Sequence, residues 1–157
     1  MAAQITAEQL ELFEVLRGLT PEERGALAPQ FKVESYPAGK VIFREGDPGN
    51  KVYFVLRGVV QIEKGVDEAN ATRLARLGRG ELMGEISVLD KSPRTATATA
   101  YVDTELAVMG RQQVDALVAT HPKIAAKIFL GISQSLARRL RSADDEITQL
   151  TKRLYYF

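Results

Sequence analysis

The sequence contains no cysteine and a single histidine, His121. Without cysteine there can be no disulfide scaffold, thiolate metal site, iron–sulfur cluster or cysteine nucleophile. No apolar run approaches the roughly 18 residues that a membrane-spanning helix needs, and the N-terminus lacks the pattern of a signal peptide. We therefore expect a cytoplasmic chain that does not bind a membrane.

A strong excess of one charge is also missing, since 21 basic and 20 acidic residues give a net charge of +1. A nucleic-acid-binding face needs an excess of Lys and Arg on one side. The basic residues that could form such a face are followed by the acidic run Asp144–Glu146. This mixture of charges indicates a solvated helix face instead. We expect no nucleic-acid partner. These basic residues are Lys127, Arg138, Arg139 and Arg141.

Catalytic chemistry has little support in the sequence. No Ser/His/Asp arrangement or cluster of metal ligands lies near His121, which precedes Pro122 at an apparent helix start with Thr120 as the cap. A surface or capping role is therefore expected for this histidine. We predict no enzyme activity, no catalytic residues, no metal and no cofactor.

The chain is long enough for one domain, and its first part, residues 1–30, has the signals of short N-terminal helices. Thr6–Gln9 and Thr20–Glu23 both have the form of a capping box, and Pro21 stands at a first helical position. Apolar residues at helical spacing follow the first box: Leu10, Phe13, Leu16 and Leu19.

Residues 31–110 are rich in short β-forming runs separated by turn signals at intervals of about 8–12 residues, a pattern typical of an antiparallel sandwich or barrel. A polar insert, residues 65–72, predicts a surface hairpin loop. The fold class is thus mainly β with flanking helices (α+β): an antiparallel β-roll or jelly-roll barrel with N-terminal helices and a long C-terminal helix. The predicted strands are 41–43, 52–56, 59–62, 74–77, 95–102 and 106–108.

Residues 111–157 are predicted to be helical, with a coiled-coil-like stretch from residue 136. Its apolar residues alternate spacings of 4 and 3, which places Arg139 at a g position and Asp144 at the following e position. This seam favours a parallel homodimer, although a single amphipathic helix lying on the barrel also has such spacings. The seam residues are Leu136, Leu140, Ala143, Ile147, Leu150, Leu154 and Phe157.

The segment from Gly80 to Leu89, followed by Arg94, carries the chemistry. A glycine-opened turn leads into a short helix, whose first N–H groups favour a phosphate, and arginine offers a planar fork of donors to phosphate oxygens. Gly84 allows close approach of a ligand, and Glu85 beside an anion site suits a neutral hydroxyl such as that of a ribose. These features indicate a sugar phosphate. The alternative is that Glu85 and Arg94 form an ion pair that pins a loop.

Gly84-Glu85-Ile86-Ser87 and Arg94-Thr95-Ala96 resemble the phosphate-binding cassette of the cyclic nucleotide-binding domain family, which here spans residues 80–98. That family includes the catabolite activator protein, kinase regulatory subunits and gated channels. Further segments are similar to the glycine framework and the long helix of the family, so the resemblance extends from about Leu16 to Leu154. These segments are 36–39, 43–49, 53–59 and 137–140.

The resemblance implies a role for each cassette residue. Glu85 would accept a hydrogen bond from the ribose 2′-hydroxyl, and Arg94 would pair with the cyclic phosphate together with the N–H groups of Ile86 and Ser87. Thr95 stands where a hydroxyl reaches the phosphate and, in some members, favours guanine. We expect cAMP in preference to cGMP, with dual binding open.

The resemblance is less complete around the base. Hydroxyl side chains on the long helix contact the base in the bacterial activators, and Ala143 and Asp144 align there. Because Ala143 cannot form a side-chain hydrogen bond, either stacking and shape hold the base, or Arg139, Arg141 or Asp144 contacts it.

The bacterial activators also continue into a DNA-binding domain, whereas this sequence stops at Phe157. We expect a complete dimeric receptor that signals to an unidentified downstream protein, the alternative being an excised sensor. By the mechanism of the family, phosphate on Arg94 would tighten the cassette and the helix beyond Gln112 would close over the base. Two other functions stay open: a ligand-free barrel that serves as a dimerisation module, and a pocket for another anionic metabolite. Retention of both Glu85 and Arg94 argues against the ligand-free barrel.

Overall fold

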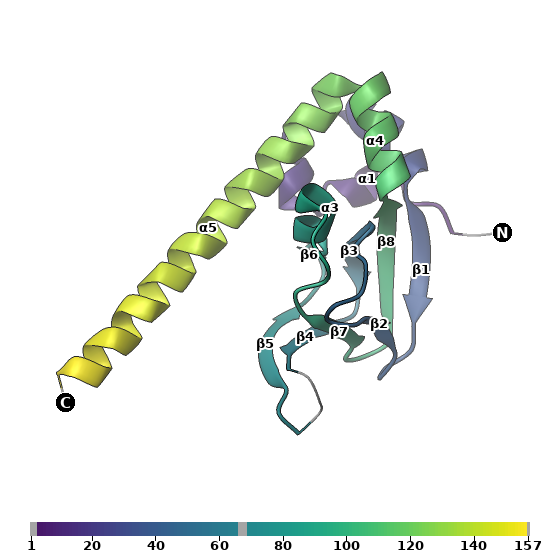
Figure 1. Cartoon of the computed structure of the whole chain (residues 1–157). Helices are drawn as coiled ribbons and strands as arrows, with labels where there is room; N and C mark the ends of the chain where they lie inside the picture. The colour runs from purple at the N-terminus through teal and green to yellow at the C-terminus, as the bar shows by residue number, and fades with distance from the viewer. Residues whose placement is uncertain (1–2, 66–68, 157) are drawn as a thin grey trace.

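A computed structural model describes residues 3–65 and 69–156, and within these residues the chain forms two antiparallel sheets of 4 strands with helices at both ends. The first sheet has the strand order β1-β8-β3-β6 and the second β2-β7-β4-β5 (Figure 1). This arrangement confirms the predicted fold class. The strands are β1 (Lys32–Tyr36), β2 (Val41–Phe43), β3 (Lys51–Arg57), β4 (Val60–Lys64), β5 (Thr72–Leu77), β6 (Leu82–Met83), β7 (Thr97–Ala100) and β8 (Thr104–Gly110).

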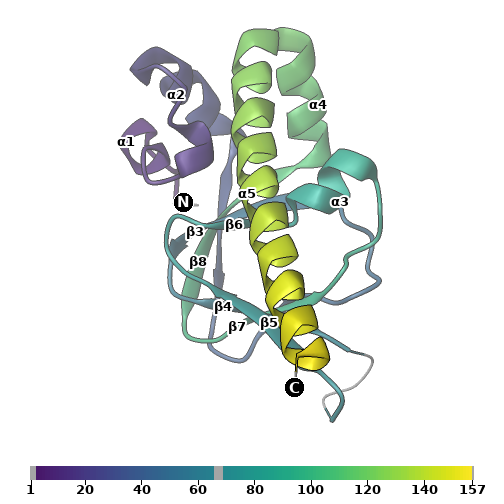
Figure 2. The same ribbon diagram turned by 90° about the vertical axis from the view of Figure 1, so that its left-hand side faces the viewer.

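The helices lie mainly before and after the strands, with one inserted between β6 and β7. Figure 2 shows the N-terminal helices and α4 on opposite sides of the upper half of α5, while the lower half of α5 diverges from the sheets in Figure 1. The helices are α1 (Ala7–Leu10), η1 (Glu14–Leu16), α2 (Pro21–Leu27), η2 (Ala28–Gln30), α3 (Glu85–Asp90), α4 (Arg111–Thr120) and α5 (Pro122–Tyr155).

Both predicted capping boxes are present. The Thr6 hydroxyl accepts from the Gln9 N–H at 3.2 Å, and the Thr20 hydroxyl accepts from the Glu23 N–H at 3.2 Å. The first helix is nevertheless shorter than its apolar spacing suggests, because the N–H groups of residues 11–13 bond three residues back, as in a 3₁₀ turn. The apolar residues that follow this box are buried all the same, so they contribute to the core without a continuous helix.

Alternation along β3 divides the core into two clusters. Val52 and Phe54 face the helices, where Phe54 packs edge-to-face on Phe13 and Phe31 with ring centroids 5.0 and 5.1 Å apart. Tyr53 and Val55 point into the interior of the roll. A strand buried on both faces in this way fixes its register, since a one-residue slip would exchange the two clusters.

Several predicted boundaries are wrong for local reasons. Two strands were not predicted: β1, whose side chains are largely polar, and β6, which has only two residues. The predicted strand 95–102 shortens to β7, because the Arg94 N–H donates to the Asp47 carbonyl in the turn after β2 and not to a neighbouring strand. Residues 59–62 and 74–77 do form a hairpin as β4 and β5; of the predicted loop 65–72, residues 66–68 lie outside the described residues.

The start of α5 also differs from the prediction. His121, not Thr120, is the N-cap residue, and it provides no side-chain capping bond. The Thr120 hydroxyl instead donates to the Ala116 carbonyl at 2.7 Å, within the last turn of α4. His121 is exposed, as a surface position predicts.

The N-terminal helices are fastened to α5 by ion pairs and by one close backbone approach. Lys127 Nζ lies 2.8 Å from Glu23 and Arg138 Nη2 lies 2.9 Å from Glu14. The hydrogen bond from Lys127 lowers the pKa of the Glu23 carboxyl. Gly131 of α5 lies against Val15, and a Cβ at this glycine would collide with the Val15 carbonyl oxygen.

We expect Gly131→Ala to destabilise the fold by about 1–3 kcal/mol, because the added methyl forces η1 away from α5. Gly25, also in a helix, is the matched control, since a Cβ there would meet open space. Gly25→Ala should therefore stabilise by about 0.5–1 kcal/mol through helix propensity. Urea unfolding of both variants measures the difference, and equal changes would show that the contact with Val15 is unimportant.

Candidate functional site

The start of α3 is shaped by Gly84, which has a left-handed backbone with φ of 83°. A Cβ at this position would lie 2.5 Å from Arg94 Nη1 and 2.9 Å from the Lys51 carbonyl oxygen. Only glycine combines this conformation with such a close approach. The turn therefore brings the first N–H groups of α3 next to the guanidinium of Arg94.

Arg94 is a buried cation, with 4% of the residue exposed. Its Nη1 donates to the Gly84 carbonyl at 3.1 Å and its Nη2 to the Lys51 carbonyl at 2.7 Å. The guanidinium carbon lies 4.3 Å from the centre of the Phe43 ring, a cation–π contact. Burial lowers the pKa of Arg94, while neighbouring Tyr53 counteracts this effect.

The Nε of Arg94 has no hydrogen-bond partner in the part of the chain that the structure describes. A buried donor on a charged group without a partner costs free energy. An anion next to Arg94 would supply both the opposite charge and the missing acceptors. The arrangement is therefore suited to a phosphate.

Arg94 and the start of α3 line a hollow of about 400 Å³, which we call the phosphate pocket. This volume lies within the range of small-molecule sites, roughly 300–1,000 Å³. The structure brings all the predicted cassette residues to its wall: Gly84, Glu85, Ile86, Ser87, Arg94 and Thr95.

The partner of Glu85 is Arg139 of α5. Glu85 Oε1 accepts from Arg139 Nη1 at 2.7 Å, and the Glu85 side chain is only 5% exposed. The interpretation of Glu85 and Arg94 as an ion pair is therefore wrong, since Arg94 donates to backbone carbonyls instead. A carboxylate of the pocket is thus joined directly to the long C-terminal helix.

The other predicted base-contacting residues lie further along α5. Arg139 lines the phosphate pocket, whereas Ala143 lines an adjacent hollow that shares Arg139 with it. Asp144 is exposed and lines neither hollow. In this structure, Arg139 is therefore the residue of the three that reaches the pocket.

The apolar wall of the pocket, which was not predicted, comes from sheet residues. Ile62 of β4 pairs in register with Ala75 of β5, and both line the pocket. The alternation of side chains between the two faces of these strands was the signal from which the wall residues could have been predicted. The carbonyls that hold Arg94 belong to the backbone, so no side-chain pattern could have revealed them. The further wall residues include Phe43, Leu77, Leu82 and Met83.

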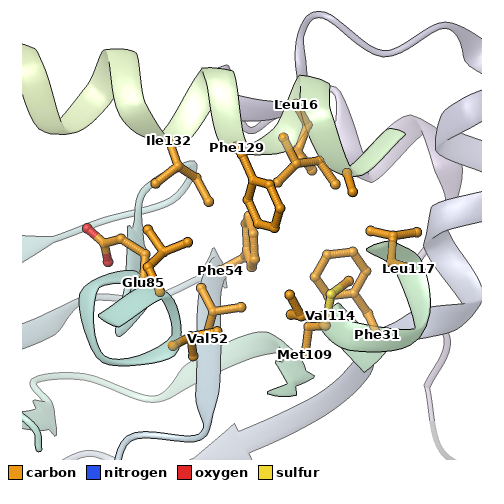
Figure 3. Close-up of a pocket in the computed structure, with 14 residues that line it drawn as sticks. Leu16, Phe31, Val52, Phe54, Glu85, Met109, Val114, Leu117, Phe129 and Ile132 are labelled. Atoms are coloured by element: carbon orange, nitrogen blue, oxygen red, sulfur yellow. The ribbon is translucent and has the colours of Figure 1, made fainter. Parts of the chain in front are cut away.

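A second, apolar cavity of about 40 Å³ lies on the helical side of the sheet (Figure 3). Side chains of β3, α3, α4 and α5 line it, and Phe54, Phe129 and Ile132 are among them. Glu85 borders both this cavity and the phosphate pocket, and Figure 3 shows its carboxyl group directed away from the apolar side chains. Helix α3 therefore contacts the pocket on one side and the helical layer on the other.

The predicted seam of α5 is exposed from Leu140 onward, while Leu136 packs against the core. The alternative that this segment lies on the barrel is wrong, because Leu140, Ile147 and Leu154 all face solvent. Phe157 lies outside the described residues. The seam thus remains available for an intermolecular contact.

Within residues 3–65 and 69–156, no helix is long and apolar enough to cross a lipid bilayer. The same residues contain no group of three or more His, Asp or Glu side chains arranged to hold a metal ion.

An antiparallel roll with a buried arginine beside a short inserted helix defines a small-molecule-binding domain. Residues 33–121 match the family model described as the cyclic nucleotide-binding domain, and the chain belongs to this family.

Three comparisons with known proteins agree with this assignment. The chain is 39% identical over 137 residues to the cyclic AMP receptor protein of Thermus thermophilus, covering 87% of this chain and 62% of that protein. A solved cyclic nucleotide-binding domain from Methylobacillus flagellatus superposes with a TM-score of 0.84 at 26% identity, covering 95% of this chain and 88% of the other. The catabolite activator protein of Thermus thermophilus gives a TM-score of 0.77 at 38% identity, with 88% and 63% covered.

Proposed function

We propose that the chain is a cytoplasmic, non-catalytic receptor that binds cAMP in preference to cGMP and signals through α5. The observation that carries this proposal is Arg94, a buried cation with an unpartnered donor in a pocket of suitable size. The 39% identity to a cyclic AMP receptor protein supports the choice of nucleotide.

In this proposal the cyclic phosphate binds Arg94 and the N–H groups of Ile86 and Ser87. Charge-assisted hydrogen bonds to a buried arginine are among the stronger ones, about 1.5–3 kcal/mol each. Gly84 leaves room for the guanidinium of Arg94, and Glu85 accepts from the ribose 2′-hydroxyl while retaining its bond to Arg139. The start of α3 thereby provides hydrogen-bond partners for both the phosphate and the sugar.

Recognition of the base is the next part of the proposal. The apolar wall at Ile62 and Leu77 suits the flat faces of a purine, and Arg139 is within the same pocket. Ala143 and Asp144 would approach the base only if α5 moves toward the roll or a second copy contributes them. Stacking and shape therefore hold the base in the arrangement described here.

The signal would travel through the Glu85–Arg139 pair. Because Arg139 belongs to α5, a change in the charge environment of Glu85 acts directly on the helix that carries the exposed seam. We propose that this seam forms a parallel homodimer, whose geometry a downstream protein recognises. A ligand can shift such an equilibrium only by its differential affinity for the two states.

Isothermal titration of cAMP and cGMP into the purified chain tests the proposal. Micromolar binding of cAMP, about −8 kcal/mol, with weaker binding of cGMP would support it. The absence of heat with both nucleotides would favour the ligand-free dimerisation module, and tighter binding of cGMP would reverse the nucleotide preference.

Thr95, at the exposed edge of the pocket, is expected to set part of the preference between the two nucleotides. Thr95→Ala should weaken cGMP binding about fivefold more than cAMP binding, since one net hydrogen bond contributes roughly 1 kcal/mol. Thr72→Ala, an exposed threonine of β5, is the control. An unchanged ratio of the two dissociation constants would exclude a contact between Thr95 and the base.

A further inference from the structure

The guanidinium of Arg139 has two sides with different surroundings. One side holds Glu85 at 2.7 Å and approaches the Leu82 carbonyl at 3.4 Å. The side chain is nevertheless 46% exposed, and these two bonds use only two of the five N–H donors of the planar fork. Arg139 can therefore bind a second carboxylate without releasing the first.

Asp144 is a carboxylate suited to this role. It is exposed on α5, and in the portion of the chain that the structure describes its side chain takes part in no ion pair. Within one helix it cannot reach Arg139 easily, because residues five apart do not share a face as those three or four apart do. In a parallel helix pair, however, a g residue faces the e residue five positions later on the partner.

The same helix offers the surface that such a pair requires. Leu140, Ile147 and Leu150 are exposed on one stripe that continues to Leu154, and Arg139 and Asp144 flank the first of these positions. An apolar stripe bordered by opposite charges at g and e positions is complementary to a second copy of itself. The occupant of this face is therefore a parallel copy of α5.

We propose that Arg139 bridges Glu85 of its own chain and Asp144 of the second copy, so that one cation joins the phosphate pocket to the dimer seam. This inference rests on the dimer of the proposed function. When a ribose hydroxyl donates to Glu85, that carboxylate binds Arg139 less strongly. The bond between Arg139 and Asp144 of the second copy then becomes stronger. Nucleotide binding therefore strengthens the dimer and, by reciprocity, dimerisation strengthens nucleotide binding.

The dimer dissociation constant, measured by analytical ultracentrifugation, tests the bridge. A symmetric dimer contains the pair twice, so Asp144→Asn should weaken the dimer about five- to thirtyfold, which corresponds to roughly 0.5–1 kcal/mol per pair. Asp145→Asn removes the same charge from the adjacent exposed residue and should have little effect. In an Arg139→Gln background, Asp144→Asn should cause no further loss.

The bridge would be refuted if Asp144→Asn and Asp145→Asn weakened the dimer equally. It would also be refuted if Asp144→Asn had its full effect in the Arg139→Gln background, or if the chain were a monomer at all concentrations. A second measurement compares the dimer dissociation constant with and without cAMP. We expect cAMP to tighten the wild-type dimer and Asp144→Asn to remove most of that gain. If calorimetry shows that cAMP does not bind, the proposed function fails, whereas the nucleotide-free mutant comparison still decides whether Arg139 and Asp144 are paired.

Discussion

Arg94→Ala is expected to weaken cAMP binding by at least about a hundredfold. The substitution removes at least two charge-assisted hydrogen bonds to the phosphate, at about 1.5–3 kcal/mol each. It also removes a buried cation, since Arg94 is 4% exposed, and this cation is the charge that the phosphate balances. Isothermal titration, or competition with a fluorescent nucleotide for weak variants, measures the change.

Controls for this prediction separate binding from folding. Arg94→Gln keeps an amide that can donate to the Gly84 or Lys51 carbonyl, so it preserves the local structure while removing the charge. Arg57→Ala removes an exposed arginine that pairs loosely with Glu105 at 3.6 Å, and it should leave binding unchanged. A folded Arg94→Gln variant with wild-type affinity would exclude Arg94 as the phosphate ligand.

Ile147→Asp is expected to convert the proposed homodimer to a monomer, with the dissociation constant raised at least about a hundredfold. Each copy loses the burial of one large apolar side chain, about 1.5–3 kcal/mol, and the loss occurs twice in a symmetric dimer. The new carboxylates would in addition lie close together in the seam. Sedimentation or light scattering across a concentration series measures the change.

Leu130→Asp provides the matched control for the seam. Leu130 lies on the same helix with 59% of the residue exposed, against 61% for Ile147, but it is outside the apolar stripe. We expect this variant to dimerise as the wild type does. If both variants dimerise normally, the homodimer does not use the seam.

Local signals in the sequence were sufficient for the starts of α1 and α2 and for the cassette residues of the pocket. The hydroxyls of Thr6 and Thr20 each accept from the N–H three positions later, so the sequence pattern and the capping contact involve the same residues. The cassette residues likewise lie within one short segment, and all of them line the pocket.

Long-range partners could not be obtained in this way. Glu85 and Arg139 are 54 positions apart, and although the family resemblance brought Arg139 near the base, no local pattern pairs it with Glu85. Strand β1 was missed for a related reason: its pairing with β8 depends on residues some 70 positions later, not on its own polar composition. The seam of α5 had two interpretations until the exposure of Leu140 and Ile147 distinguished them.

The close packing of Gly131 on Val15 provides a point about which α5 could pivot. The helix is anchored there, is contacted by the pocket at Arg139, and ends at Tyr155. At 1.5 Å per residue these points lie about 12 Å and about 36 Å from the anchor. If α5 pivots rigidly about Gly131, a displacement of 1 Å at Arg139 becomes about 3 Å at Tyr155. A small adjustment of the pocket would thus be magnified along the exposed seam of α5.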